Sequence, residues 1–261
     1  MKHCLIVLLL TSSSCVAQRW EAEVMAGVSG YKGDLTEHMF TLKTMGPSAG
    51  FNLKYNFNDV FILRGGITWG QVKANDKNNH QADLKSRNLN FHSNILEGNL
   101  CIETNLFEPV FFSAYPYVFA GIGVFHFNPY TYDNNGKKTY LQPLGTEGQG
   151  LPSYPGRKPY SLTQFCLPFG GGIKINLNKK CDFVYELAGR VLFTDYLDDV
   201  SKTYVRTQTL MTNSRPKAAE LAYRQTGTAS PNEGDIRGNP KVNDWYFISG
   251  FKLLIRLGKE K

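Results

Sequence analysis

Apolar and polar side chains alternate along the chain in segments of about ten residues, and the gaps between these segments are alternately short and long. Segments 48–57 and 60–69 are separated by two residues only, whereas residues 128–162 and 194–243 separate later segments. Alternation with a period of two places one set of side chains on each face of a β-strand. Short turns that alternate with long loops are typical of transmembrane β-barrels of the outer-membrane type. A soluble β-sandwich has no reason to segregate its loop lengths in this way.

The pattern predicts eight strands, at about 20–30, 48–57, 60–70, 87–105, 113–127, 163–176, 182–193 and 244–256. The turns 58–59, 107–112 and 177–181 fall on one side, and the segments 31–47, 71–86, 128–162 and 194–243 fall on the other. Barrels of this type keep short turns in the periplasm and long loops outside the cell. We therefore expect an all-β fold: an eight-stranded antiparallel up-and-down transmembrane β-barrel, with short periplasmic turns, long extracellular loops and both termini periplasmic.

Two of the predicted strands depart from simple alternation. In segment 87–105 the apolar residues change from odd to even positions, and a β-bulge near Ile95 and Leu96 would produce such a change of phase. Segment 113–127 is apolar on both faces. Its Gly121 and Gly123 suggest that the odd-numbered face points into a crowded interior, because glycine fits where other groups approach closely.

The second face of the predicted strands carries charges of both signs. The expected inward-facing charged residues are Glu21, Glu23, Lys54, Arg64, Lys174, Glu186, Arg190, Lys252 and Arg256. An eight-stranded barrel is just wide enough for side chains to fill it, and an unpaired buried charge is very unfavourable. We expect these residues to form a buried ionic network that plugs the lumen, so that the barrel is not an open pore. A soluble lipocalin-like barrel would instead need apolar residues inside and charges outside.

The N-terminus resembles a secretory signal. Lys2 precedes the apolar run 5–10, and Ala17 provides a small residue for cleavage before Gln18. We expect a signal peptide at 1–17 and one outer-membrane β-barrel domain at 18–261, with lipidation at Cys15 as a less favoured alternative. Cys101, Cys166 and Cys181 remain, an odd number on or beside strands, and are expected to pack as small hydrophobic residues.

Composition narrows the class further. The hydrophobic content of 42% is too high for a disordered chain, and the mean hydropathy is −0.30. The net charge of +7 comes from interspersed basic and acidic residues, without a run of five like charges. We therefore expect outer-membrane lipid as a partner, and neither nucleic acid nor a small-molecule substrate.

No catalytic, cofactor-binding or metal-binding residue is predicted. The histidines at 38, 80, 92 and 126 have no second histidine or cysteine at metal-ligand spacing, and His126 imitates a lipid-modifying barrel enzyme only weakly. Asp195, Asp198 and Asp199 would suit calcium, but they lack the spacing of an EF-hand. A structured loop base, with aspartates in turns and caps, is the favoured interpretation.

Several segments together resemble a known family. They are 27–35 with the sequence Tyr-Lys-Gly-Asp-Leu at 31–35, 141–150, 159–164, 194–201, 237–240 and 244–246. This set is similar to the Bacteroidetes outer-membrane β-barrel family that includes PorG, a component of the type IX secretion system. The resemblance spans most of the chain after the signal segment. It implies an accessory barrel that associates with the ring of the periplasmic proteins PorK and PorN.

We therefore expect a non-enzymatic barrel subunit of the type IX protein secretion machinery, which needs no cofactor and is required for export of secreted proteins. The alternative is a stand-alone surface-binding or adhesion barrel that uses its long extracellular loops. A lipid enzyme at the loop end is the third hypothesis.

Overall fold

The computed structural model describes residues 19–38, 40–107, 113–213, 215–225 and 231–257. The predicted signal peptide at 1–17, including Cys15, lies outside these residues. The strands are β1 (Trp20–Lys32), β2 (Gly46–Asn56), β3 (Phe61–Asn75), β4 (Asn90–Asn105), β5 (Ala114–Phe127), β6 (Tyr130–Tyr132), β7 (Lys138–Tyr140), β8 (Thr163–Asn178), β9 (Cys181–Leu192) and β10 (Trp245–Arg256). Among the described residues, no helix is both long enough and apolar enough to cross a membrane.

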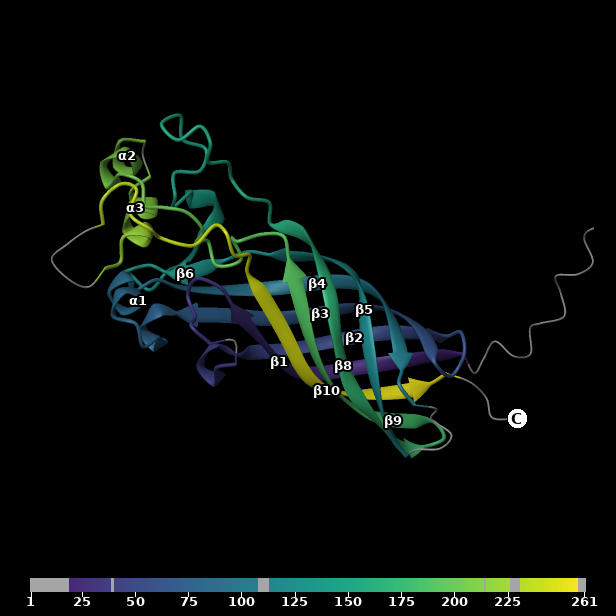
Figure 1. Cartoon of the computed structure of the whole chain (residues 1–261). Helices are drawn as coiled ribbons and strands as arrows, with labels where there is room; N and C mark the ends of the chain where they lie inside the picture. Colours follow the sequence, from purple (N-terminus) through teal and green to yellow (C-terminus); the bar gives the residue numbers. More distant parts are fainter. Residues whose placement is uncertain (1–18, 39, 108–112, 214, 226–230, 258–261) are drawn as a thin grey trace, which may run out of the picture.

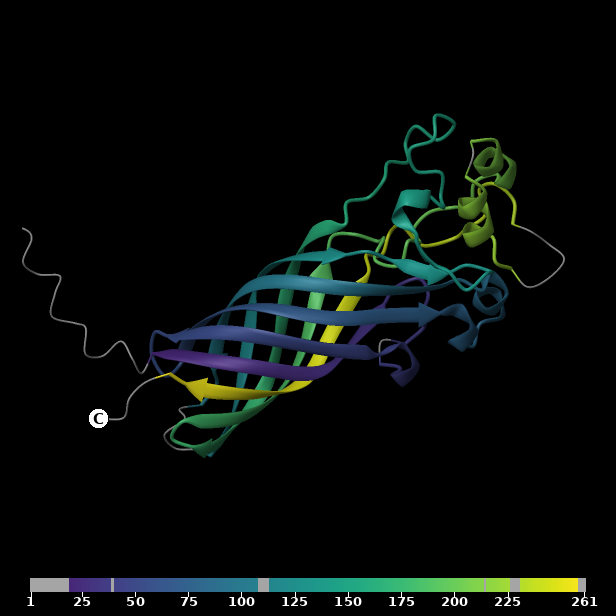
Figure 2. The ribbon, with the colours of Figure 1, turned by 180° about the vertical axis from the view of Figure 1, so that it is seen from behind.

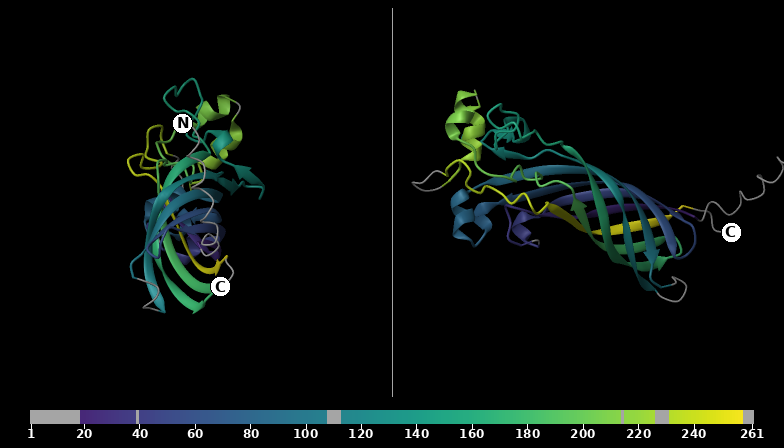
Figure 3. Two further views of the ribbon diagram at one scale, coloured as in Figure 1. Left: turned by 90° about the vertical axis from the view of Figure 1, so that its right-hand side faces the viewer. Right: turned by 45° about the horizontal axis from the view of Figure 1, so that its top comes forward.

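Eight of these strands form a closed antiparallel barrel, as predicted. The order around the sheet is β3, β2, β1, β10, β9, β8, β5, β4, and pairing of β3 with β4 closes it (Figure 1). The end-on view in Figure 3 shows the ring. Each strand pairs with its sequence neighbours among these eight, and the first strand, β1, pairs with the last, β10, which is the up-and-down arrangement. The hairpin of β6 and β7 joins the edge of β4 through the pair His92 and Tyr130, beyond the end of the barrel.

Loop lengths are segregated between the two ends of the barrel, which confirms the predicted rhythm. The turns after β2, β4 and β8 lie at the end where the chain leaves β10, and the connections after β1, β3, β5 and β9 lie at the opposite end (Figures 1 and 2). Asparagine side chains close two of the turns: Asn58 accepts the backbone N–H of Phe61 (2.7 Å), and Asn178 accepts that of Lys180 (2.9 Å). We call these two regions the turn end and the loop end.

The long connections contain short helices that the sequence pattern did not reveal. They are η1 (Leu42–Thr44), η2 (Asp76–Asn78), α1 (Ala82–Arg87), η3 (Gln142–Leu144), α2 (Thr207–Thr212) and α3 (Pro216–Ala222). None is long enough for a helical period to stand out, and helices of this length depend on tertiary packing. For α2 and α3 this packing is a small apolar cluster that includes Leu210, Ala218 and Val205.

The outer faces of the barrel strands are apolar and exposed. Phe51, Ile67, Ile122 and Phe165 are 47%, 61%, 64% and 70% exposed, respectively, on four different strands. Aromatic residues cluster near one rim, where the ring centroid of Tyr55 lies 5.1 Å from Trp20 and 5.3 Å from Phe57. If the barrel stood in water, a belt of large hydrophobic side chains would be exposed to it. In a membrane, the hydrocarbon of the lipids would cover this belt.

The bulge predicted near Ile95 and Leu96 is wrong. Pairing of β4 with both neighbours runs through these residues without a register shift. All inward residues of β4 have odd numbers, but Phe91 and Ile95 face an apolar layer, whereas Glu97 and Glu103 face a charged interior. The change of phase therefore reflects a change in what fills the barrel. For β5, the odd-numbered face points inward as expected, and a Cβ at Gly123 would lie 2.9 Å from the sulfur of Cys166.

A layer of buried aromatic and aliphatic side chains fills the barrel near the loop end. Tyr31, Phe91, Phe125, Phe127 and Tyr246 are at most 1% exposed and belong to one cluster. The rings of Phe125 and Phe127 stack at 5.4 Å, and Phe127 stacks on Tyr160 of a loop at 6.2 Å. This layer separates the charged interior of the barrel from the loops above it.

Candidate functional site

Ion pairs fill the interior of the barrel, and seven charged residues in its middle form one connected group. Lys54 lies 2.7 Å from Glu23 and 3.0 Å from Glu103, and Arg64 lies 2.6 Å from Glu186. Lys252 joins Glu23 (2.9 Å) to Glu186 (2.7 Å), and Lys174 is paired with Glu103. We call the inward-facing charged residues of the eight barrel strands the lumen network.

Charges in the lumen network balance among the described residues. The six acids are Glu21, Glu23, Glu97, Glu103, Asp182 and Glu186, and the six bases are Lys54, Arg64, Lys174, Arg190, Lys252 and Arg256. All nine inward residues predicted from the sequence lie in this set. Glu97, Glu103 and Asp182 were missed, the first two because the change of phase in β4 concealed its inward face. Side chains fill the middle of the lumen, and Arg64 lies 3.8 Å from the ring centroid of Phe119.

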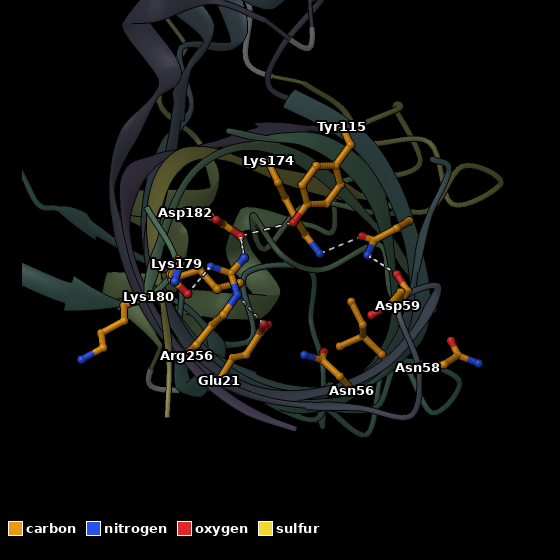
Figure 4. Close-up of a pocket in the computed structure, with 13 residues that line it drawn as sticks. Glu21, Asn56, Asn58, Asp59, Tyr115, Lys174, Lys179, Lys180, Asp182 and Arg256 are labelled. Carbon is orange, nitrogen blue, oxygen red and sulfur yellow. Dashed lines mark hydrogen bonds and ion pairs between the residues drawn. The ribbon is translucent and has the colours of Figure 1, made fainter. Parts of the chain in front are cut away.

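At the turn end the lumen opens into a polar cavity of about 280 Å³. Figure 4 shows the lining side chains that converge in this cavity, among them Glu21, Tyr115, Lys174, Asp182 and Arg256. Arg256 lies 2.5 Å from Asp182 and 3.7 Å from Glu21, and Tyr115 donates to Asp182 (3.2 Å). Lys179 and Lys180 stand exposed on its rim. The cavity presents charged groups toward the turn end and stops at the ion pairs above it.

The loop end is covered by the long connections, which meet in a buried polar centre. Glu147 lies 2.8 Å from Arg237 and accepts the backbone N–H groups of Ser201 (3.0 Å) and Lys202 (3.1 Å). Asp199 accepts hydrogen bonds from Tyr160 (2.7 Å) and Thr146 (2.5 Å). These residues come from three segments that are far apart in the sequence, so the segments that carry the family resemblance come together here. We call this assembly the loop cap.

Two arginines bind the cap together. Arg237 donates to Glu147 and to the carbonyl of Asp199 (2.6 Å). Arg87 is paired with Asp76 (2.7 Å) and donates to the carbonyls of Asp34 (2.7 Å) and Arg237 (2.5 Å). All four long loops are thereby joined by charge-assisted hydrogen bonds, which are stronger than neutral ones.

Asp195, Asp198, Asp34 of the first loop and Asp244 before β10 lie near enough for their charges to affect one another, but their oxygen atoms are not among the groups of described residues that converge within 4.8 Å. Asp199 turns toward Tyr160 and Arg237. Burial raises the pKa of Asp195 to about 8, and the charge of Asp34 adds to this effect. Burial likewise raises the pKa of Asp198 and of Asp244 well above the usual range. We call Asp34, Asp195, Asp198 and Asp244 the aspartate cluster.

The histidines are placed separately, with one exception. His126 is exposed on the outer face of β5, with its Nδ1 3.0 Å from the hydroxyl of Thr163, and His92 stacks on Tyr130 at 5.5 Å. His38 and His80 come together with Glu37, their ligand atoms within 4.8 Å of one another. Sequence spacing could not show this, because the two loops meet only in the fold. Glu37 accepts the backbone N–H groups of His80 and Gln81 (2.9 Å each), and so fixes the start of α1.

The fold and interior define a closed eight-stranded β-barrel of outer-membrane architecture, with a plugged lumen and a covered loop end. Residues 2–145 match the model of a family described as a domain of unknown function, DUF6089, and the chain belongs to this family. No curated protein matches the chain.

Several solved structures of outer-membrane barrels align with this chain over most of its length. Neisserial surface protein A has 9% identity, with 91% of this chain and 96% of that chain covered and a TM-score of 0.45. A major outer membrane protein from Thermus thermophilus has 10% identity, with 90% and 98% covered and a TM-score of 0.43. OprG from Pseudomonas aeruginosa has 10% identity, with 92% and 98% covered and a TM-score of 0.41.

Proposed function

We propose that this protein is a non-enzymatic outer-membrane β-barrel that serves as a structural subunit of the type IX protein secretion machinery. The observation that carries the proposal is the sealed barrel: ion pairs fill the lumen, an apolar layer lies above them, and the loop cap covers that end. A barrel filled in this way has no path for cargo. Its activity then resides in its two end surfaces, which suits a subunit that positions other proteins.

Placement in the outer membrane is supported by the exposed apolar belt. Strands cross a membrane only as a closed sheet, because every backbone group in hydrocarbon must find a partner within the protein. With short turns in the periplasm and long loops outside, the described ends of β1 and β10 face the periplasm. The turn-end cavity and its exposed Lys179 and Lys180 would then face the periplasmic space.

The type IX assignment is supported by the resemblance of the loop and strand-entry segments to the PorG-containing family. That resemblance implies association with the ring of PorK and PorN on the periplasmic side. Deletion of the protein should abolish export of secreted proteases, and the tagged protein should capture the ring proteins from detergent extracts. Normal export in the deletion strain would contradict the proposal.

A pair of matched variants locates the contact. Lys179 and Lys180 are adjacent and exposed at the turn end, and Lys137 and Lys138 are adjacent and exposed at the loop end. We expect Lys179→Glu with Lys180→Glu to weaken ring capture and export, because reversal of charge at the turn end opposes a periplasmic partner. Lys137→Glu with Lys138→Glu makes the same change of charge and should leave both unchanged.

A stand-alone surface-binding barrel is the second candidate. The loop cap favours it, because the long connections would be displayed outside the cell as a surface held together by buried polar contacts. This candidate predicts the opposite result for the two double variants: loss of binding to host or matrix surfaces with the loop-end change, and normal export in the deletion strain. For the third hypothesis, a lipid enzyme, His126→Ala should leave lipid A chemistry unchanged if the protein is not an enzyme.

A further inference from the structure

Three side chains of the kinds that bind metals come together from the first and second long loops at the loop end. Glu37 and His38 follow β1, and His80 precedes α1 (Figure 1). Their ligand atoms all lie within 4.8 Å of one another, and the two imidazole rings meet edge to face with centroids 6.3 Å apart. Within the described part of the chain, no other group of histidine, cysteine and acidic residues converges in this way. We call these three residues the histidine cluster.

Hydrogen bonds across the two loops hold Glu37 in place. Its backbone N–H donates to the side chain of Asn79 (3.2 Å), and the ammonium group of Lys32 donates to its carbonyl (2.9 Å). Asn79 is buried and also donates to the carbonyl of Leu35 (3.0 Å). The backbone segments that carry the three side chains are therefore already joined in the folded protein. Such preorganisation lowers the entropy that is lost when a ligand binds.

The carboxylate of Glu37 is oriented but not saturated. Its Oε1 accepts the backbone N–H of Gln81, and its Oε2 accepts that of His80 (2.9 Å each). A carboxylate has about four acceptor positions, so Oε1 retains one for a further partner. Carboxylates that bind metals are usually hydrogen-bonded themselves, because these contacts fix the direction of the ligand. The two backbone hydrogen bonds therefore prepare Glu37 as a ligand.

The two imidazole rings take almost no part in holding the loops together. Among the described residues, the ring of His38 has no hydrogen-bond partner, and the ring of His80 contacts only the Glu37 carboxylate, at 3.3 Å from its Nδ1. Both residues are exposed, and 85% of the His80 side chain is accessible. Ring nitrogens are thus available as ligands, and an ion can reach them directly from solvent, as a metal site requires.

We propose that Glu37, His38 and His80 form a zinc site that joins the first and second loops. Imidazole nitrogen and carboxylate oxygen are common zinc ligands, and three protein ligands leave the fourth tetrahedral position to water. Calcium and magnesium prefer oxygen ligands alone, so the two histidines disfavour both ions. Ligand atoms in a tetrahedral zinc site stand about 3.3 Å apart. Rotation of the exposed rings would bring the cluster to that spacing while the carboxylate stays in place.

The experiment uses the full chain, purified in detergent micelles through a tag that contains no histidine and freed of metal with EDTA. Isothermal titration with zinc chloride should show one ion per chain. We expect His38→Ala and His80→Ala each to lose at least about tenfold in affinity, because loss even of a residue that only supports a ligand costs about 10–100-fold. The control is His126→Ala, which removes an exposed histidine from the outer face of β5 and should match the wild type.

Hydrogen exchange shows whether the ion joins the loops. Zinc should slow exchange of backbone amides in the first and second loops of the wild type and of His126→Ala, because a ligand that binds the folded state opposes local opening. In His80→Ala zinc should have no such effect. Without zinc, His80→Ala should exchange like the wild type, since its ring makes so few contacts with the fold.

Three results would overturn the proposal. They are absence of saturable binding at one zinc per chain, unchanged affinity in both His38→Ala and His80→Ala, and an equal loss of affinity in His126→Ala. Binding of several ions that persists in the cluster variants would show adventitious surface binding only. The zinc site uses contacts within the chain alone, so its test is independent of the proposed role in secretion.

Discussion

The lumen network and the loop cap both bury many charged side chains, but they do so in opposite ways. In the lumen, the six acids and six bases stand on strands and pair within the barrel, both between neighbouring strands, as where Glu23 of β1 meets Lys54 of β2, and across the interior, as where Arg64 of β3 meets Glu186 of β9. In the cap, residues from distant loops meet, and the arginines of the described segments pair with acids other than the four clustered aspartates. The difference is that charges in the lumen are balanced by residues of the strands, whereas the cap keeps carboxylates with which no arginine or lysine of the described residues forms an ion pair.

The largest effect is expected when a lumen cation is removed. Lys54→Met leaves Glu23 and Glu103 short of a partner in a fully buried setting, and loss of one member of a buried ion pair costs about 3–5 kcal/mol of stability. Reversible urea unfolding in lipid vesicles measures the change. Lys180→Met, on the exposed rim, is the control and should leave stability unaltered. A small effect for Lys54→Met would mean that Lys252 and Lys174, which also pair with Glu23 and Glu103, compensate for its loss.

A double-mutant cycle tests whether the lumen charges act in pairs. Arg190 lies 2.9 Å from Glu97, and both are buried. We expect Glu97→Gln with Arg190→Met to cost less than the sum of the single changes, with a coupling free energy of about 1–3 kcal/mol. Additive single effects would show that this pair contributes no mutual stabilisation.

The same type of change in the loop cap should have the opposite sign. At pH 9, above the pKa of about 8 to which burial raises Asp195, Asp195→Asn removes a buried negative charge, so we expect the variant to be about 1 kcal/mol more stable than the wild type. Urea unfolding under the same conditions gives the comparison. Glu103→Gln, which removes a carboxylate from the balanced lumen, should destabilise the protein. If both variants lose stability to the same extent, the contrast between the two regions does not hold.

Strand alternation was sufficient to predict the barrel, because an eight-stranded sheet with one lipid-facing and one filled face imposes a period of two on every strand. The predicted bulge in β4 failed because an apolar inward residue at Ile95 imitates an outward one. The loops were predictable in length but not in structure. The helices α1, α2 and α3 have six or seven residues each, which is too few for a helical period of apolar residues to stand out in the sequence.

The candidate sites could be predicted only in part. Inward charges such as Lys54 and Glu186 could be predicted because apolar and polar residues alternate along each strand. The aspartate cluster was half visible: Asp195 and Asp198 stand together in the sequence, but Asp34 lies far earlier in the chain and joins them only through closure of β1 on β10. Likewise, His38 and His80 meet because of loop packing, which no local spacing encodes.

A conductance measurement tests most directly whether the barrel is sealed. The purified full chain is reconstituted into a planar lipid bilayer, and insertion is checked by protection of the strands from protease. With six acids and six bases paired in the lumen and an apolar layer above them, we expect no discrete current steps at any voltage that the bilayer tolerates. Reproducible unitary steps from inserted protein, abolished by a bulky substitution in the lumen, would contradict it.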